Sequence, residues 1–196
     1  MNTKTILILV VLVTCFCNKQ VYAASWIKPV ASMTFDGYVT QDKDRPNTFY
    51  GYSVKTGPSG DYYYIKTVME YYGTGFGISS LILDNGDEYK KLMNSSQNGM
   101  AKAFVRLDSS PYIALYHGKI FNKYTVTATL SRFQPPQISS KLTIIRDNDK
   151  VVEDFEYGYI NTIYYLTVFR KRYIIVSITS CSASMCNDEL KAYRLQ

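Results

Sequence analysis

The segment YTVTATLS (124–131) alternates strictly between apolar and hydroxyl-bearing side chains. Tyr124, Val126, Ala128 and Leu130 fall on one face of an extended chain, and the threonines and serine between them fall on the other. A period of two residues is that of a β-strand with one buried and one hydrated face. This segment therefore predicts a strand, and similar segments lie along the rest of the chain.

Other segments rich in β-branched and aromatic residues are also predicted strands. Short turn sequences such as Asp84-Asn85-Gly86 separate them, and gaps of this length favour antiparallel hairpins over crossover helices. We expect a short helix only at 87–94. The further predicted strands are 47–56, 60–72, 77–84, 101–107, 111–117, 140–147, 150–157, 160–169, 172–180 and 187–194.

Several predicted strands carry large side chains on both faces. In DYYYIKTVMEYY (61–72), Tyr62 and Tyr64 lie on one face, and Tyr63 and Ile65 lie on the other. A barrel that encloses a cavity, or whose outer face is covered, buries both faces of its strands. We therefore expect an all-β fold, an antiparallel up-and-down β-barrel, with a β-sandwich filled by its own aromatic side chains as the alternative.

The N-terminus has the pattern of a secretory signal peptide. Lys4 precedes an apolar run at 6–16, and the small residue Ala23 stands at the expected cleavage position. The run has about half of the roughly 20 apolar residues that a membrane anchor needs. The sequence thus predicts a signal peptide at 1–23 and a secreted, extracellular domain at 24–196 with no membrane span.

The charge of the chain is mildly basic, with 22 Lys and Arg against 16 Asp and Glu. Removal of the signal peptide takes away Lys4 and Lys19. Basic residues are scattered among acidic ones apart from Arg170-Lys171-Arg172, so no stripe suited to nucleic acid is present. We expect no nucleic-acid partner, and the three basic residues are interpreted as a hairpin tip, with a small anion contact as the alternative.

Cleavage after Ala23 leaves two cysteines, Cys181 and Cys186. An even pair in an oxidising compartment predicts a disulfide. The competing interpretation is a metal site, but one distant histidine, His117, does not complete a tetrahedral set with two sulfurs. The sequence therefore predicts a Cys181–Cys186 disulfide and no metal.

Catalytic motifs are not recognisable in the sequence. His117 is the single imidazole, no nucleophile-elbow sequence is present, and a disulfide removes the thiol nucleophile. The acidic clusters at 41–47, 84–88 and 147–150 lack the spacing of a calcium loop and are interpreted as turns. We expect no enzymatic activity and no cofactor. Asn94-Ser95-Ser96 is a glycosylation sequon, which predicts a glycan on Asn94 in an external loop.

The C-terminal part resembles the last strands of lipocalins. In that family a KL strand leads to a strand of the form YWVL, a turn, a further strand ending in cysteine, and a final strand ending in arginine. The matching residues are Lys141-Leu142, Tyr164-Tyr165-Leu166-Thr167-Val168, Tyr173-Ile174-Ile175-Val176, Cys181 and Arg194. The resemblance implies a lipocalin-like barrel, with Arg194 packed over Trp26 to close one end through a cation–π contact.

These features together predict a secreted protein that carries or sequesters a small hydrophobic or amphipathic ligand in a cavity. Tyrosine suits the cavity wall because its ring packs against a ligand and its hydroxyl reaches polar groups. The alternative is a secreted β-sandwich interaction module whose tyrosine-rich face binds another protein or a surface. The expected ligand-lining residues are Tyr50, Tyr52, Tyr62, Tyr64, Phe104 and Tyr165.

Overall fold

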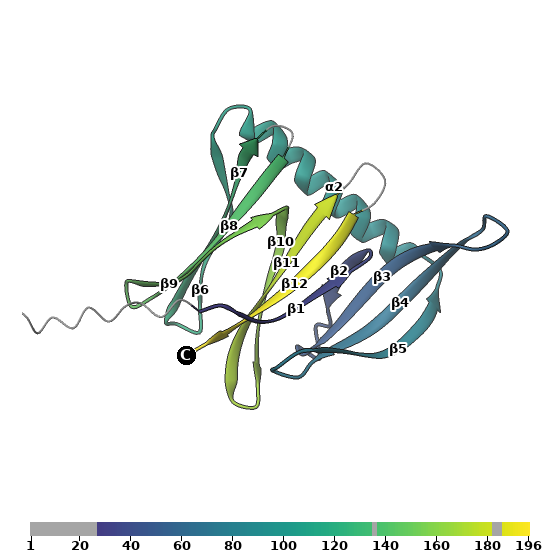
Figure 1. Cartoon of the computed structure of the whole chain (residues 1–196), viewed down its shortest axis with the longest axis horizontal. Helices are drawn as coiled ribbons and strands as arrows, with labels where there is room; N and C mark the ends of the chain where they lie inside the picture. Colours follow the sequence, from purple (N-terminus) through teal and green to yellow (C-terminus); the bar gives the residue numbers. More distant parts are fainter. Residues whose placement is uncertain (1–26, 135–136, 182–185) are drawn as a thin grey trace, which may run out of the picture.

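The computed structural model describes residues 27–134, 137–181 and 186–196. This part of the chain forms three four-stranded antiparallel sheets and one long helix (Figure 1). Sheet A has the order β1 (Pro29–Phe35), β12 (Cys186–Leu195), β11 (Lys171–Cys181), β10 (Tyr159–Val168). Sheet B has the order β2 (Tyr38–Gln41), β3 (Thr48–Thr56), β4 (Tyr62–Tyr71), β5 (Phe76–Asp84). Sheet C has the order β6 (Tyr112–Ile120), β7 (Tyr124–Gln134), β8 (Gln137–Arg146), β9 (Asp149–Tyr157).

The predicted all-β, antiparallel fold is confirmed. Sheets B and C are meanders in which each strand pairs with the next along the chain, as the short turns indicated. Within the described residues the strands do not close into a barrel, because β5 and β6 belong to different sheets and are joined by a helix. The result is a layered arrangement of separate sheets.

Sheet A lies between the other two sheets and is buried on both faces. Along β11, Ile174 and Val176 pack into a core shared with sheet C, whereas Tyr173 and Ile175 pack into a core shared with sheet B. Alternate side chains therefore enter different cores. This explains why the segment YIIVSITS lacks the polar alternation of a strand with one wet face.

Two glycines occupy the corners where the chain passes from one sheet to another. Gly37, with φ 140°, joins β1 to β2, and Gly158, with φ 135°, joins β9 to β10. A side chain at Gly37 would overlap the carbonyl oxygen of Tyr52, and a Cβ at Gly158 would lie 2.6 Å from the Oγ of Ser180. Both corners need the positive φ and the missing side chain that glycine provides.

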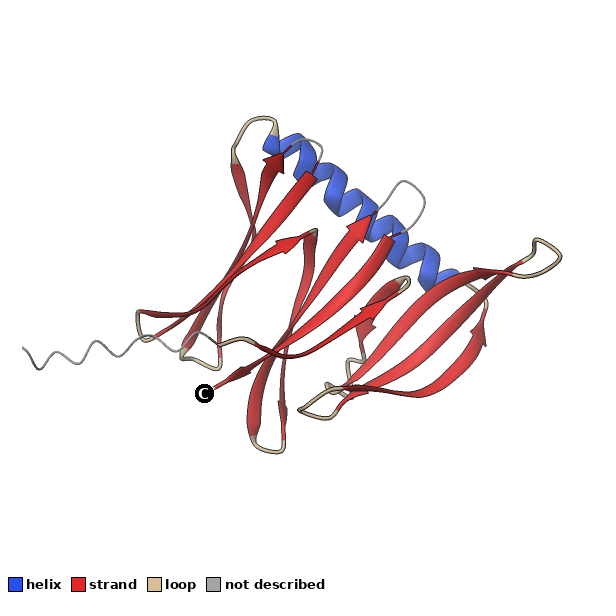
Figure 2. Ribbon diagram, viewed as in Figure 1, coloured by secondary structure: helices blue, strands red, loops and turns tan. Residues whose placement is uncertain are grey.

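The helix α2 (Asp87–Leu107) crosses one end of the sheets and contacts strands of all three, as Figure 2 shows in blue. Ser96, Ala103 and Leu107 are buried on its inner face at helical spacing. The prediction of a strand at 101–107 was wrong. Its alternating pattern, Ala101 to Leu107, also fits a helix whose buried positions are four residues apart, and alanine favours the helix.

The disulfide between Cys181 and Cys186 is present. The two residues are directly opposite in the register of β11 and β12, so the bond closes the end of this hairpin. The predicted pairing is confirmed.

Candidate functional site

A pocket of about 740 Å³ lies between α2 and the ends of β8, β9 and β11. Its wall is mostly apolar, and Tyr157 and Ser180 are exposed at its surface, so it opens to solvent. The lining residues are Met100, Phe104, Ile138, Tyr157, Gly158, Thr179, Ser180 and Cys181.

The helical wall of the pocket comes from successive turns of α2. Met100 and Phe104 are four residues apart and therefore share one side of the helix. Ala103 and Leu107 lie next to this side and pack with Ile113 and Leu130 of sheet C, which holds the helix against the strand ends. The pocket wall is thus fixed by packing of the same helix.

The opposite wall depends on the glycine corner between β9 and β10. Tyr159 pairs with Thr179, so Gly158 lies close to the end of β11. The Ser180 hydroxyl donates a hydrogen bond of 2.9 Å to the carbonyl of Tyr157, and the Ser140 hydroxyl donates one of 2.7 Å to the carbonyl of Gly158. These two bonds fix the corner against sheets A and C and leave the Ser180 oxygen able to accept a further hydrogen bond.

A buried carboxylate lies behind the pocket. Asp188 is fully buried and accepts hydrogen bonds from the Thr179 hydroxyl (2.6 Å) and from the backbone N–H of Val39 (2.8 Å). Burial raises the pKa of Asp188 to about 6, against the lowering effect of these hydrogen bonds. Because Val39 belongs to β2 and Thr179 to β11, Asp188 joins sheet B to the sheet that bears the pocket.

Sheets A and C are joined by a second polar group. Lys191 forms an ion pair of 2.5 Å with Glu156, and the Tyr193 hydroxyl donates to Asp154 at 2.8 Å. Glu156 is buried, and desolvation raises its pKa. The ion pair and the Tyr193 hydrogen bond both cross from β12 to β9, which makes this group a structural link between the two sheets.

Of the six expected ligand-lining residues, Phe104 lines the pocket and the other five do not. The structure therefore does not bring all six residues together in this pocket, and contact of the other five with a ligand stays a prediction. Tyr50, Tyr52 and Tyr64 lie on one face of sheet B, where the ammonium of Lys66 sits 4.1 Å from the Tyr50 ring centre. Tyr62 of β4 is exposed on this same face, whereas Tyr165 is exposed on β10 of sheet A.

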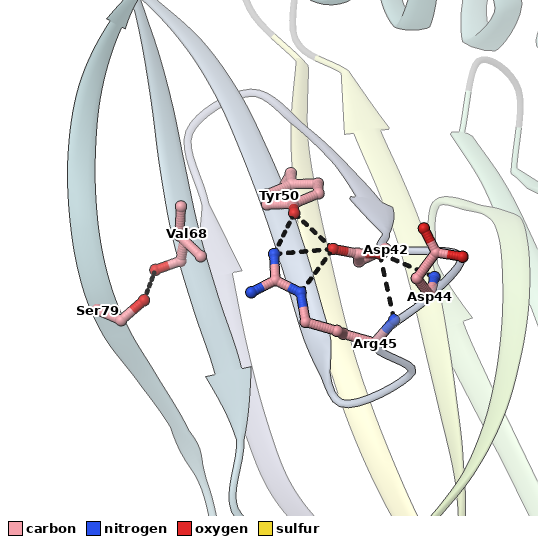
Figure 3. Close-up of polar contacts among 6 residues, drawn as sticks. All are labelled: Asp42, Asp44, Arg45, Tyr50, Val68 and Ser79. Carbon is pink, nitrogen blue, oxygen red and sulfur yellow. Dashed lines mark hydrogen bonds and ion pairs between the residues drawn. The ribbon is translucent and has the colours of Figure 1, made fainter.

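Tyr50 has a structural contact in the turn between β2 and β3, shown in Figure 3. Its hydroxyl donates to the carboxylate of Asp42 and accepts a 2.6 Å hydrogen bond from Arg45. Asp42 also accepts from the backbone N–H groups of Asp44 and Arg45. The Tyr50 hydrogen bond, followed by these backbone bonds, lowers the pKa of Asp42. The acidic cluster at 41–47 is a turn, as predicted.

Three other predicted residues are placed as follows. Asn94 is exposed on α2, so its predicted position in a loop was wrong. Glycosylation of Asn94 stays a prediction. Arg194 is exposed near the end of β12, and Trp26, its expected partner, lies outside the described residues. His117 is exposed on β6, with its Nδ1 3.1 Å from the Thr127 hydroxyl.

The sequence interpretation missed Met100, Ile138, Tyr157 and Ser180. Met100 was hidden because the helix was expected to end at 94. Ile138, Tyr157 and Ser180 lie at strand ends beside turns, and a pattern of alternation carries no information about which ends meet in space. Gly158 was the available signal, since a glycine between two strands marks a corner or a close approach.

Across the three described stretches, no three His, Cys, Asp or Glu side chains are grouped as metal ligands would be. In those same stretches no helix combines the length and the apolar character needed to cross a membrane.

Comparison of the chain with protein families, with curated proteins and with solved structures finds no match.

Proposed function

We propose that this protein is a secreted, non-enzymatic binding protein that carries or sequesters a small uncharged apolar or amphipathic molecule. The observation that carries the proposal is the pocket beneath α2. Its volume of about 740 Å³ lies in the usual range of ligand sites, and apolar side chains make most of its wall. The signal-like segment at 1–23 supports secretion.

The chemistry of the wall narrows the class of ligand. Met100, Phe104 and Ile138 offer an apolar surface for the body of the ligand. None of the described lining residues carries a charge, so a carboxylate or ammonium would enter without a partner and lose its hydration. The Ser180 oxygen, which already donates its proton to the Tyr157 carbonyl, suits a donor such as an alcohol or an amide.

The relation to lipocalins remains a proposal that rests on the C-terminal strand motifs. In the binding mode proposed here the ligand lies beneath a helix at the ends of strands, whereas a closed barrel holds it among inward-facing side chains. The resemblance therefore supports extracellular binding of a small molecule but not a barrel-interior site.

Titration with a neutral polarity-sensitive dye such as Nile red tests the function. We expect saturable binding of one dye per chain, competed by long-chain alcohols more strongly than by fatty acids of equal length. Phe104→Lys should weaken binding at least tenfold, because it places a charge in the apolar wall. The matched control is Val105→Lys, since Val105 is 70% exposed on the same helix and is absent from the lining.

Unchanged dye affinity in Phe104→Lys, or no saturable binding by the wild type, would overturn the proposal.

A second candidate function is a protein-interaction module. It is favoured by the exposed apolar side chains on and beside β4 and β5, which include Tyr62, Tyr63, Leu81 and Leu83. This candidate predicts that the protein does not bind the dye and that substitutions on β5 change its binding to another protein.

A further inference from the structure

The strand β5 forms an open edge of sheet B. Within the described residues β5 pairs with β4 and with no other strand, so one side of its backbone faces away from the sheet (Figure 1). Its sequence, FGISSLILD, has no proline and no charge before Asp84. Proline, lysine and inward-pointing charge protect many edge strands from pairing, and β5 has none of them, although it contains one β-bulge.

Apolar side chains are exposed on both faces of this edge. Leu81 (67%) and Leu83 (77%) lie on the face that also bears Thr67, and Ile82 (50%) lies on the opposite face beside Lys66. An occupant of the edge must therefore supply backbone hydrogen bonds together with apolar side chains above and below the sheet. A strand of the same composition meets all three requirements.

A β-bulge limits the length of regular edge that is available. Ser79 is the extra residue between the pairs Val68 with Ser80 and Met69 with Ile78. Figure 3 shows the Ser79 hydroxyl donating a hydrogen bond of 3.2 Å to the carbonyl of Val68. The bulge breaks the alternation on its N-terminal side, so the regular edge runs from 80 to 84.

We propose that β5 pairs antiparallel with β5 of a second copy of this chain, about a two-fold axis that passes through Ile82. Residues whose numbers add to 164 then lie opposite each other. Leu81 faces Leu83 of the second copy, Ile82 faces Ile82, and Ser80 faces Asp84. Every apolar side chain of the regular edge meets another on the same face, and each Asp84 carboxylate lies beside a hydroxyl. The interface is isologous, as a two-fold dimer requires.

A comparison with another register, and the distances between like charges, both support an axis through Ile82. An axis through Leu81 would place Asp84 opposite Ile78 and Ile82 opposite Ser80, which separates the apolar pairs. With the axis at Ile82 the two Asp84 carboxylates are about 14 Å apart along the strands. The two Lys66 side chains are also about 14 Å apart, across three strand spacings. Both distances exceed the screening length of about 8 Å at physiological salt, so like charges do not oppose pairing.

Sedimentation of the secreted protein at increasing concentration tests the association. We expect the wild type to approach twice the chain mass by about 100 μM, since a single strand-to-strand interface is small and gives a weak dimer. Leu81→Lys should keep the mass of one chain throughout, and the matched control Val105→Lys should behave as the wild type does. A wild type that stays at single-chain mass, or a dimer unaffected by Leu81→Lys, would overturn the proposal.

Cysteine cross-linking tests the register. Ile82→Cys places two cysteines directly opposite, at a Cα separation that a disulfide spans, and should give a linked dimer under mild oxidation. Leu81→Cys faces Leu83 and should cross-link much less, whereas Leu81→Cys mixed with Leu83→Cys should link the two variants to each other. All three parent residues are exposed, so the substitutions leave the fold intact. Equal cross-linking of Ile82→Cys and Leu81→Cys would contradict the register.

Discussion

The hydroxyl of Thr179 donates a 2.6 Å hydrogen bond to the carboxylate of Asp188, so that a residue of the pocket wall is tied to a fully buried acid. The same carboxylate accepts from the backbone of Val39 in sheet B. Asp188 is therefore a polar link between the pocket wall in sheet A and the neighbouring sheet B.

This burial makes stability depend on pH. The pKa of Asp188 is about 6 in the folded protein and 3.8 for an ordinary aspartate, so the folded state binds the proton more tightly. Protonation adds stability that is fully present below the ordinary pKa and is lost as pH rises through 6. We predict that the free energy of unfolding of the wild type, minus that of Asp188→Asn, falls by about 2 kcal/mol from pH 4 to pH 7.

Urea unfolding at several pH values measures this difference. The Asp188→Asn variant is a suitable reference because the amide oxygen of the new side chain accepts from Val39 and its NH₂ donates to the Thr179 oxygen. Other carboxylates contribute equally to both proteins and cancel. A difference that does not vary with pH would show that Asp188 titrates at its ordinary pKa.

Replacement of the glycine corner should destabilise the protein. Gly158→Ala places a Cβ 2.6 Å from the Ser180 Oγ and 2.9 Å from the Thr179 carbonyl, at a φ that alanine rarely adopts. We expect a loss of about 2 kcal/mol in unfolding free energy. Gly75→Ala is the control, since a Cβ there meets nothing within 4 Å. Equal thermal midpoints for the two variants would contradict the close approach at Gly158.

Loss of the Tyr50 hydroxyl should affect the β2–β3 turn and not the pocket. Tyr50→Phe removes the hydrogen bond that contributes most to the lowered pKa of Asp42. We predict that the Asp42 pKa, followed by NMR titration, rises toward its ordinary value. Dye affinity should stay unchanged because Tyr50 is not a lining residue. Weaker dye binding by this variant would instead place a ligand on sheet B.

Removal of the disulfide should have a limited effect. The bond closes a loop of only a few residues, for which the loss of chain entropy corresponds to about 2 kcal/mol. Cys181→Ala/Cys186→Ala should thus remain folded with a lower unfolding midpoint, and it should bind the dye more weakly because Cys181 lines the pocket. Global unfolding of the double variant would mean that the hairpin end holds the fold together.

Local patterns predicted the strands and hairpins because both depend on near neighbours in sequence. The alternation of 124–131 gave the right element type, whereas the turn at Asp84-Asn85-Gly86, expected to connect a hairpin, leads from β5 into α2. The strands β1 and β2 were missed, since the half-exposed PVASMTF and the short YVTQ carry weak patterns. Large side chains on both faces were recognised in 61–72, but the burial of β11 between two sheets of the same chain was not predicted.

The division into three sheets could not be predicted from local signals. It depends on the pairing of β1 with β12, which are more than a hundred residues apart, and on the corners at Gly37 and Gly158. Only the first part of the helix, 87–94, was expected, because the inner face of α2 uses the small residues Ser96, Gly99 and Ala103 and lacks a large apolar stripe. For the same reason the pocket residues Met100 and Phe104 were not recognised as neighbours on one helix.

Native mass spectrometry of the purified protein tests ligand binding beneath α2. We predict a chain without residues 1–23, carrying one uncharged small molecule that is released on collisional activation. Phe104→Lys should lose this molecule, and Val105→Lys should retain it. A wild-type protein that carries no added mass after mixing with a neutral long-chain alcohol, or a Phe104→Lys variant that retains the molecule, would contradict binding beneath α2.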